Sequence, residues 1–440
     1  MRPVNAVVER YMPSALVFAI LLTVVVAVLA LLLTDTGPRA VLVAWGDGLS
    51  GLLEFMTQMA LILLLGCMLA NTRPVRRGLA WLARLPRSPL QAYVFVFVIA
   101  AALSLVQWGL GLMAGGLMAR EVAAQMRAKG VRVHFPLLVA SGFSGFVVWH
   151  MGYTGSGPLT AATADSFVAA QIGRAIPLSE TTFAPWNIIT AVVTVVVVAG
   201  AIALIAPRGG DRVVELEVDA REAELEVEQP VTPADRLDAS RILTTVTGLG
   251  IVAYLVVYFV DGGTPTLNIV NWTFLALVLL LVRSPFEIVA LVKNAVTNVG
   301  DILLQFPLYA GILGIITATG LVQIFSDVFV NVSTPQTFGF LAFLSAGLVN
   351  FFVPSGGGQF AVQGPILLDA ANQLGVDPAV AIMAVAYGDQ WTNMVQPLWA
   401  LPLLAIAGLK VRDILGYTTV TMLASGIVFA ATLLIVGPGV

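Results

Sequence analysis

The chain is built from long apolar runs separated by short polar segments. Runs of about twenty apolar residues match the length that a helix needs to cross the hydrocarbon core of a bilayer. Glycine- and proline-rich stretches interrupt several other apolar segments. The pattern predicts an all-α polytopic membrane protein in which some spans are broken. The uninterrupted runs lie at roughly 12–34, 51–70, 186–206, 240–260, 302–321 and 418–436.

Composition agrees with this class. Of 440 residues, 58% are hydrophobic and 11% are charged, whereas soluble domains contain about 25% charged residues. Ten of the 25 acidic residues lie between Asp211 and Asp238, so the apolar part carries few charges. Cys67 is the only cysteine, which excludes a disulfide framework and a metal cluster of thiolates. We therefore expect a lipid bilayer as partner, and no nucleic acid.

Arginine and lysine positions suggest a topology, because these residues concentrate in short cytoplasmic loops. One threading places the N-terminus in the cytoplasm and makes the chain a multi-pass membrane protein. Residues 1–206 then form a first transmembrane repeat and 240–440 a second. The charged segment 207–239 is expected to be a solvated cytoplasmic linker, although its Glu/Val alternation is also compatible with a short strand pair.

Each half contains a predicted hairpin and a predicted broken helix: hairpin 88–127 with broken helix 135–172, and hairpin 336–373 with broken helix 379–408. "LVQWGLGLMAGGLMAREVAAQMRAKGV" in the first half matches "LVNFFVPSGGGQFAVQGPILLDAANQLGV" in the second. Under the threading the hairpins open to opposite sides, so the repeats are inverted, as is typical of secondary transporters. Half-helix N-termini near the midplane offer free N–H groups and a partial positive charge to an anion.

Three motifs carry a family resemblance: "NFFVPSGGGQFAVQGP", "GDQWTNMVQPLWALPLLAIAGLKVRDILGY" and "QWGLGLMAGGLMARE". Together they resemble the bacterial short-chain fatty acid transporter family, whose permeases carry butyrate or acetoacetate. The resemblance covers the chain outside the acidic segment. It implies a layout similar to the ion transporter superfamily, with two re-entrant hairpins and two unwound helices. It also implies cation-coupled symport of small monocarboxylates, elevator-type alternating access, a homodimer and a location in the bacterial inner membrane.

The second half holds most of the candidate substrate-binding residues. Prolines and a triple glycine predict that residues 354–358 leave the helical conformation, which is tolerated in a bilayer only where the backbone is buried in protein or lines a cavity. The alternative is an extramembrane turn. Asn350 and Gln363 flank this break as possible helix caps. The candidates here are Ser355, Gly356, Gly357, Gly358, Gln359, Thr392 and Asn393.

The first half supplies Gln107, Trp108 and Gly109 at the hairpin tip, and Thr154 and Ser156 at the matching break. The candidate coupling-ion residues are His150, Asp389 and Gln390. Sodium is favoured by the superfamily analogy, and protons by the titratable side chains; we expect no other cofactor. A structural histidine and a helix-capping aspartate are the alternatives. No arginine lies in either break, which favours a monoanion over a dicarboxylate.

An intramembrane enzyme and a channel are the two rival classes of protein. "GFSG" at 142–145 resembles the serine motif of rhomboid-type proteases, but these enzymes need a histidine base on a different helix. His150 lies in the same span and His134 in a juxtamembrane loop, so we expect no enzyme. The alternative within transport is a channel, or a carrier for another small organic anion, since unwound backbone also builds selectivity filters.

Overall fold

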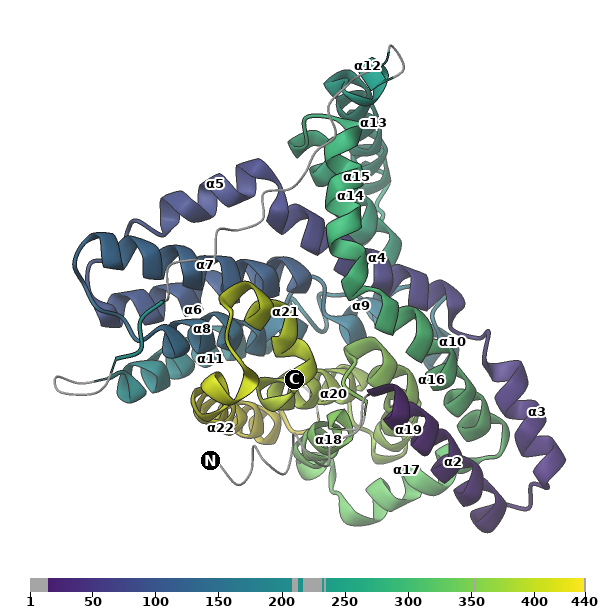
Figure 1. Ribbon diagram of the computed structural model, residues 1–440. Coiled ribbons are helices and arrows are strands. Elements are labelled where there is room, and N and C mark those ends of the chain that lie inside the picture. The colour runs from purple at the N-terminus through teal and green to yellow at the C-terminus, as the bar shows by residue number, and fades with distance from the viewer. Residues whose placement is uncertain (1–14, 208–212, 217–231, 233–234, 352, 439–440) are drawn as a thin grey trace.

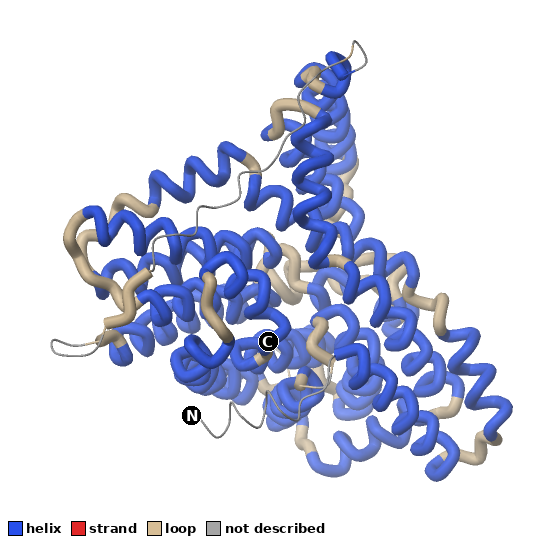
Figure 2. Tube along the Cα trace, in the orientation of Figure 1, coloured by secondary structure: helices blue, strands red, loops and turns tan. Residues whose placement is uncertain are grey.

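The computed structural model describes residues 15–207, 213–216, 232, 235–351 and 353–438. These residues form helices joined by short loops, and no strand occurs among them (Figure 2). The all-α prediction is therefore confirmed. The predicted cytoplasmic N-terminus falls on residues 1–14, and most of the predicted linker falls on residues 208–234; both lie outside the described part of the chain, apart from 213–216 and 232.

The helices of the first half are α2 (Ala15–Leu33), α3 (Pro38–Gly48), α4 (Leu53–Asn71), α5 (Arg73–Leu82), α6 (Pro89–Val106), α7 (Trp108–Ala128), α8 (Phe135–Ser144), the 3₁₀ helix η1 (Gly145–Met151), α9 (Ser156–Ala162), α10 (Phe167–Ile172) and α11 (Pro185–Ile205). Those of the second half are α12 (Asp235–Asp238), α13 (Arg241–Val260), α14 (Leu267–Leu281), α15 (Pro285–Ala295), η2 (Val296–Asn298), α16 (Gly300–Ala318), α17 (Leu321–Val332), α18 (Pro335–Asn350), α19 (Gly356–Leu374), α20 (Pro378–Thr392), η3 (Asn393–Val395), α21 (Pro397–Ala407) and α22 (Val411–Val436).

Six of the described helical segments are long and apolar enough to cross a membrane. Five of them are the single helices α4, α6, α11, α13 and α22, and the sixth joins α8, η1 and α9 into Phe135–Ala162. The run predicted at 302–321 corresponds to α16. After this helix the chain turns at Gly320, whose backbone is left-handed (φ 78°), and α17 leaves at 79° to α16. Glycine allows this turn because it adopts a positive φ without steric penalty.

The helices form a central block with two flanking groups (Figure 1). In the block, α6 packs on α7, η1 and α8, while α18 packs on α20 and α11 on α22. One flanking group is α2, α3 and α16, which pack together, with α17 beside α16 and α19. The other is the α13–α14 pair, which rises at the top of Figure 1 and whose α14 packs on α4. Helix α4 also contacts α7 and α16, so it joins the block to both flanks.

Candidate functional site

The break between α6 and α7 is a single extended residue, Gln107 (φ −155°, ψ 119°). Its side chain caps α7 by accepting the Leu110 N–H, and it donates to the Ile62 carbonyl of α4. The neighbouring Trp108 N–H donates to Thr154 Oγ1 at 3.1 Å. Gln107 and Thr154 thus hold the tip together with their own hydrogen bonds. Of the three residues predicted at the hairpin tip, only Gln107 leaves the helical conformation, whereas Trp108 and Gly109 lie in the first turn of α7.

The break between α18 and α19 ends at Ser355, whose extended backbone precedes the helix and whose Oγ accepts the Gly358 N–H at 3.3 Å. The expectation that Gly356, Gly357 and Gly358 leave the helical conformation is wrong, because they form the first turn of α19. The N–H groups of a first turn have no acceptor within the helix, so they can still meet a ligand. Aromatic packing explains the glycines: a Cβ on Gly358 would lie 2.6 Å from the Tyr309 ring.

Hydrogen bonds from Asn350, the last residue of α18, hold the second broken helix in place. Its Nδ2 donates to the Asp389 carbonyl (2.9 Å), to Thr392 Oγ1 (2.9 Å) and to Asn393 Oδ1 (2.7 Å). Gln396 Nε2 in turn donates to the Asn350 carbonyl at 2.9 Å. One of these bonds reaches the backbone near the end of α20 and another the backbone at the end of α18, so polar side chains meet the buried backbone at both helix ends, as a broken helix in lipid requires. Thr392 and Asn393 therefore support the break.

A buried contact joins the two halves of the chain at this point. His150 Nε2, from η1, lies 3.2 Å from Asp389 Oδ1, from α20. Asn393 Nδ2 donates to the same carboxylate oxygen at 2.9 Å, and Gln390 Oε1 accepts the His150 N–H at 3.0 Å. His150 and Asp389 are each 1% exposed. Five polar atoms around this contact have no partner among the described residues: His150 Nδ1, Asp389 Oδ2, Asn350 Oδ1, Gln359 Oε1 and Gln390 Nε2.

A cavity of about 200 Å³ lies beside this cluster, at the start of α19. No charged side chain belongs to its described lining. Five predicted residues line it, namely Trp108, Ser156, Ser355, Gly356 and Gly357. The other candidates do not: Gln107, Gly109, Thr154, Gly358, Gln359, Thr392, Asn393, His150, Asp389 and Gln390. His150 is nevertheless adjacent, because a Cβ on Gly356 would collide with its ring.

Three tryptophans surround the cavity. The Trp108 ring centroid lies 5.6 Å from that of Trp149 and 5.6 Å from that of Trp399. All three rings line the cavity, and none of their indole N–H groups has an acceptor among the described residues. The rest of the lining is largely apolar and comes in part from α4 and α16, through Met59, Leu63, Cys67, Ile302 and Phe306.

A family model described as "Short chain fatty acid transporter" matches residues 1–436. A relative from Escherichia coli (strain K12), provisionally named a short-chain fatty acid transporter, is 40% identical over 426 residues, 96% of each chain. A relative of the same name from Haemophilus influenzae (strain ATCC 51907 / DSM 11121 / KW20 / Rd) is 35% identical over 440 residues, 98% of this chain and 96% of its own. The chain belongs to the short-chain fatty acid transporter family.

Two solved structures share the fold of this family member. The Alcanivorax borkumensis YdaH transporter superposes with a TM-score of 0.58 at 17% identity, covering 96% of this chain and 98% of its own. MtrF of Neisseria gonorrhoeae, described as one of a class of antimetabolite efflux pumps, gives a TM-score of 0.55 at 15% identity, covering 98% and 96%. The predictions of a multi-pass membrane transporter and of no enzyme are confirmed by the family.

Sequence reasoning missed part of the cavity of this short-chain fatty acid transporter family member. From the sequence, Trp399 fits a packing or interfacial anchor as well as it fits a ligand, and no motif of the sequence singles out Trp149. A usable signal exists in retrospect, since a tryptophan stands near three of the four breaks: Trp108 after Gln107, Trp149 beside His150 and Trp399 after Pro397. The break at 354–355 has none. The residues from α4 and α16 carried no signal, because they lie in ordinary apolar runs.

Proposed function

We propose that this member of the family carries small monocarboxylates, such as butyrate or acetoacetate. Transport is by cation-coupled symport, and the substrate binds in the cavity at the start of α19. The observation that carries the proposal is the composition of this cavity: the start of α19 and three indoles bring N–H donors, most other lining residues are apolar, and no charged side chain belongs to its described lining.

The carboxylate is assigned to the first turn of α19. The N–H groups of Gly356 and Gly357 are free of helix bonds, the helix dipole places about half a positive charge there, and the Ser355 hydroxyl can donate while its oxygen caps the helix. Hydrogen bonds to an ionised carboxylate are about twice as strong as those between neutral groups. These donors therefore suit one carboxylate, and the absence of lining arginines argues against a dianion.

The apolar wall receives the short alkyl chain. An engineered apolar cavity of about 150 Å³ binds benzene, and butyrate has as many non-hydrogen atoms as benzene. The cavity of about 200 Å³ is therefore large enough for such an acid. Each buried methylene contributes about 0.8 kcal/mol, so affinity should rise from acetate to butyrate and fall again for longer chains.

The coupling cation is assigned to the His150–Asp389 cluster. Its buried carboxylate and the unpartnered oxygens of Asp389, Asn350 and Gln359 offer the ligands that a hard cation prefers, while His150 and Asp389 together form a pair that can take up a proton. Either cation would add positive charge next to Gly356, where the carboxylate binds, so cation and anion would favour each other's binding.

The alternating-access mechanism is also proposed. We infer two inverted repeats, 1–206 and 240–440, in which α6–α7 and α18–α19 are re-entrant hairpins opening to opposite sides. We further infer an elevator motion, a homodimer, and an inner-membrane location with a cytoplasmic N-terminus. The close contact of η1 with α20 across the midpoint of the chain supports the arrangement, as does the arginine distribution.

The test is uptake of labelled butyrate by purified protein in liposomes, with a sodium gradient and with a pH gradient, each imposed separately. We expect saturable uptake, concentrative under one gradient only, and thereby an assignment of the cation. Asp389→Asn should abolish accumulation but retain exchange of internal for external butyrate. Asp369→Asn is the matched control, because Asp369 also accepts hydrogen bonds, from Ser326 and Gln373, but lies away from the cluster. Unsaturable conduction at ion-channel rates would overturn the proposal.

A further inference from the structure

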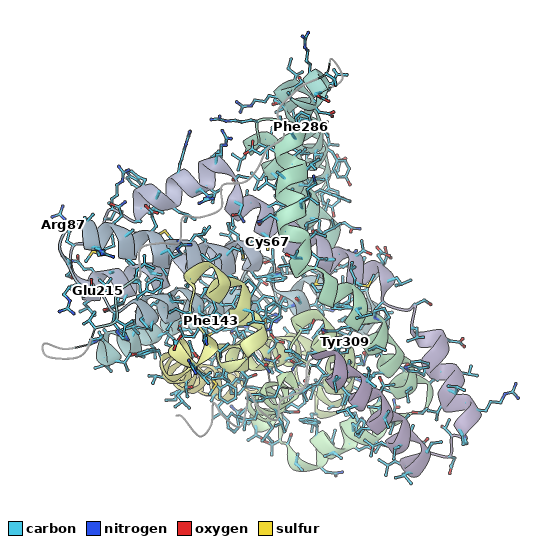
Figure 3. All side chains as sticks on the ribbon, viewed as in Figure 1. Cys67, Arg87, Phe143, Glu215, Phe286 and Tyr309 are labelled. Atoms are coloured by element: carbon cyan, nitrogen blue, oxygen red, sulfur yellow. The ribbon has the colours of Figure 1, made fainter. Side chains whose placement is uncertain are left out.

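The start of α6 carries a concentration of positive charge with no acid in its segment. Residues 73–106 contain five arginines and neither aspartate nor glutamate. Arg84 and Arg87 are exposed in the loop between α5 and α6, and Figure 3 shows Arg87 at the end of the molecule, where this loop lies. Glu215, labelled at the same end, is paired with Arg132 at 2.7 Å. The two loop arginines are thus accessible to an external anion.

A lysine side chain adds a third positive charge at the same loop. Lys129 Nζ, from the turn after α7, donates to the carbonyl oxygens of Arg84 (2.6 Å) and Pro86 (2.8 Å). The Arg87 N–H donates to the Gln91 side chain at 3.0 Å, which fixes the loop on the first turn of α6. Arg84, Arg87 and Lys129 are therefore held in a defined position at the start of α6.

An apolar groove runs down α6 directly from these arginines. A first hollow of about 730 Å³ is lined by Leu85, Pro86, Arg87, Leu90, Gln91, Val94, Phe95 and Val98. Val98, which is 38% exposed, also lines a second hollow of about 730 Å³ between α6 and α11, whose other lining residues continue to Val106. From Leu90 to Val98 the helix rises about 12 Å, close to the roughly 15 Å that one leaflet contributes to the hydrocarbon core.

We propose that this groove binds an anionic phospholipid, with its headgroup phosphate on Arg84 and Arg87 and one acyl chain along α6 past Val98. Arginine suits this headgroup because its planar guanidinium recognises phosphate through two hydrogen bonds. A soluble anion would use the arginines without the groove, and a zwitterionic lipid would use the groove while gaining less from the arginines. The site is separate from the cavity and goes beyond the proposed function.

The experiment is native mass spectrometry of the full chain in neutral detergent, with phosphatidylglycerol and phosphatidylcholine of identical acyl chains. Each basic residue near a membrane surface contributes about a fivefold preference for anionic lipid, so the arginine pair should contribute roughly 25-fold. The variant R84Q/R87Q should lose this preference, and the control R236Q/R241Q, with the same charge change at α12 and α13, should keep it. V98F should weaken binding of both lipids without altering their ratio.

Four results would overturn the proposal. The first is a phosphatidylglycerol preference that survives in R84Q/R87Q, and the second is an equal loss in R236Q/R241Q. The third is unchanged lipid binding by V98F. The fourth is binding of inorganic phosphate alone as tight as that of phosphatidylglycerol, because the acyl chain would then contribute nothing. Thermal unfolding of each variant without added lipid separates these outcomes from misfolding.

Discussion

Replacing Ser355 by alanine is the sharpest test of where the carboxylate binds. The change removes one hydroxyl from the cavity lining and leaves the glycine turn and the tryptophans in place. The hydroxyl has two roles: its oxygen caps α19 by accepting the Gly358 N–H at 3.3 Å, and its hydrogen is assigned to the substrate. Loss of the cap should lower stability and loss of the substrate hydrogen bond should weaken binding, so the two roles can be measured separately.

The binding loss follows from the charge on the acceptor. A hydrogen bond to a charged group contributes about 1.5–3 kcal/mol, and each 1.4 kcal/mol is a factor of ten in affinity. Ser355→Ala should therefore weaken butyrate binding roughly 10- to 150-fold. The lost cap should lower the free energy of unfolding by about 0.5–2 kcal/mol.

Ser284→Ala is the matched control for the cap. Ser284 begins α15, and its Oγ accepts the Glu287 N–H at the same 3.3 Å, outside the cavity lining. Both variants should lose similar thermal stability, while only Ser355→Ala should bind butyrate more weakly in counterflow and calorimetric titrations. Wild-type affinity in Ser355→Ala, or an equal loss of affinity in Ser284→Ala, would refute the assignment of this hydroxyl to the substrate.

Three further outcomes are expected. Asn350→Ala should lower the free energy of unfolding by about 2–6 kcal/mol, as detergent-solubilised thermal melts would measure. Its side chain donates to three buried acceptors, the Asp389 carbonyl keeps a second donor in the Asn393 N–H, and each of the other two left unsatisfied costs about 1–3 kcal/mol. Gly358→Ala should destabilise the protein by about 1–3 kcal/mol through overpacking against a tyrosine ring, whereas Gly200→Ala, with nothing within 4 Å, should be neutral or stabilising. His134 Nδ1 accepts a backbone N–H of segment 213–216 at 3.1 Å, and burial lowers the pKa of His134 below its ordinary value of 6.5. The neutral form of His134 is therefore favoured in the folded state. The free energy of unfolding should be highest above about pH 6.5 and should fall as the pH drops from there towards the pKa of His134 in the folded protein. His134→Gln should flatten this pH dependence in thermal melts, and an unchanged profile would contradict it.

Local chemistry accounts for what could be predicted from the sequence. The apolar runs predicted helices, and the amide Gln107 with the prolines Pro354 and Pro397 predicted where helices are interrupted. These signals act within a few residues, since proline removes a donor and a buried break needs polar side chains. The structure ends α6 at Val106 and α18 at Asn350, next to these positions.

The wall of the cavity could not be predicted in this way. Whether a polar side chain lines the cavity depends on which helix packs opposite it, and Gln359 shows the difference from Ser355. Gln359 is fully buried and donates to Ala346 and Gln363 within its own hairpin, whereas Ser355 lines the cavity. Both residues lie in the same motif, so only the three-dimensional packing separates them.

The absence of charge from the cavity lining has a consequence for transport. A carrier must return through the membrane without its substrate, and an unpaired arginine beside the empty cavity would need solvation at every return. The helix dipole of α19 attracts a carboxylate with no net charge on the protein, so this demand does not arise. The buried carboxylate of Asp389 remains, and its contacts with His150 and Asn393 supply polar partners in the substrate-free protein. Under the proposed coupling, a cation bound there would change the local charge by one unit beside Gly356, and electrostatic attraction would then favour binding of the anion.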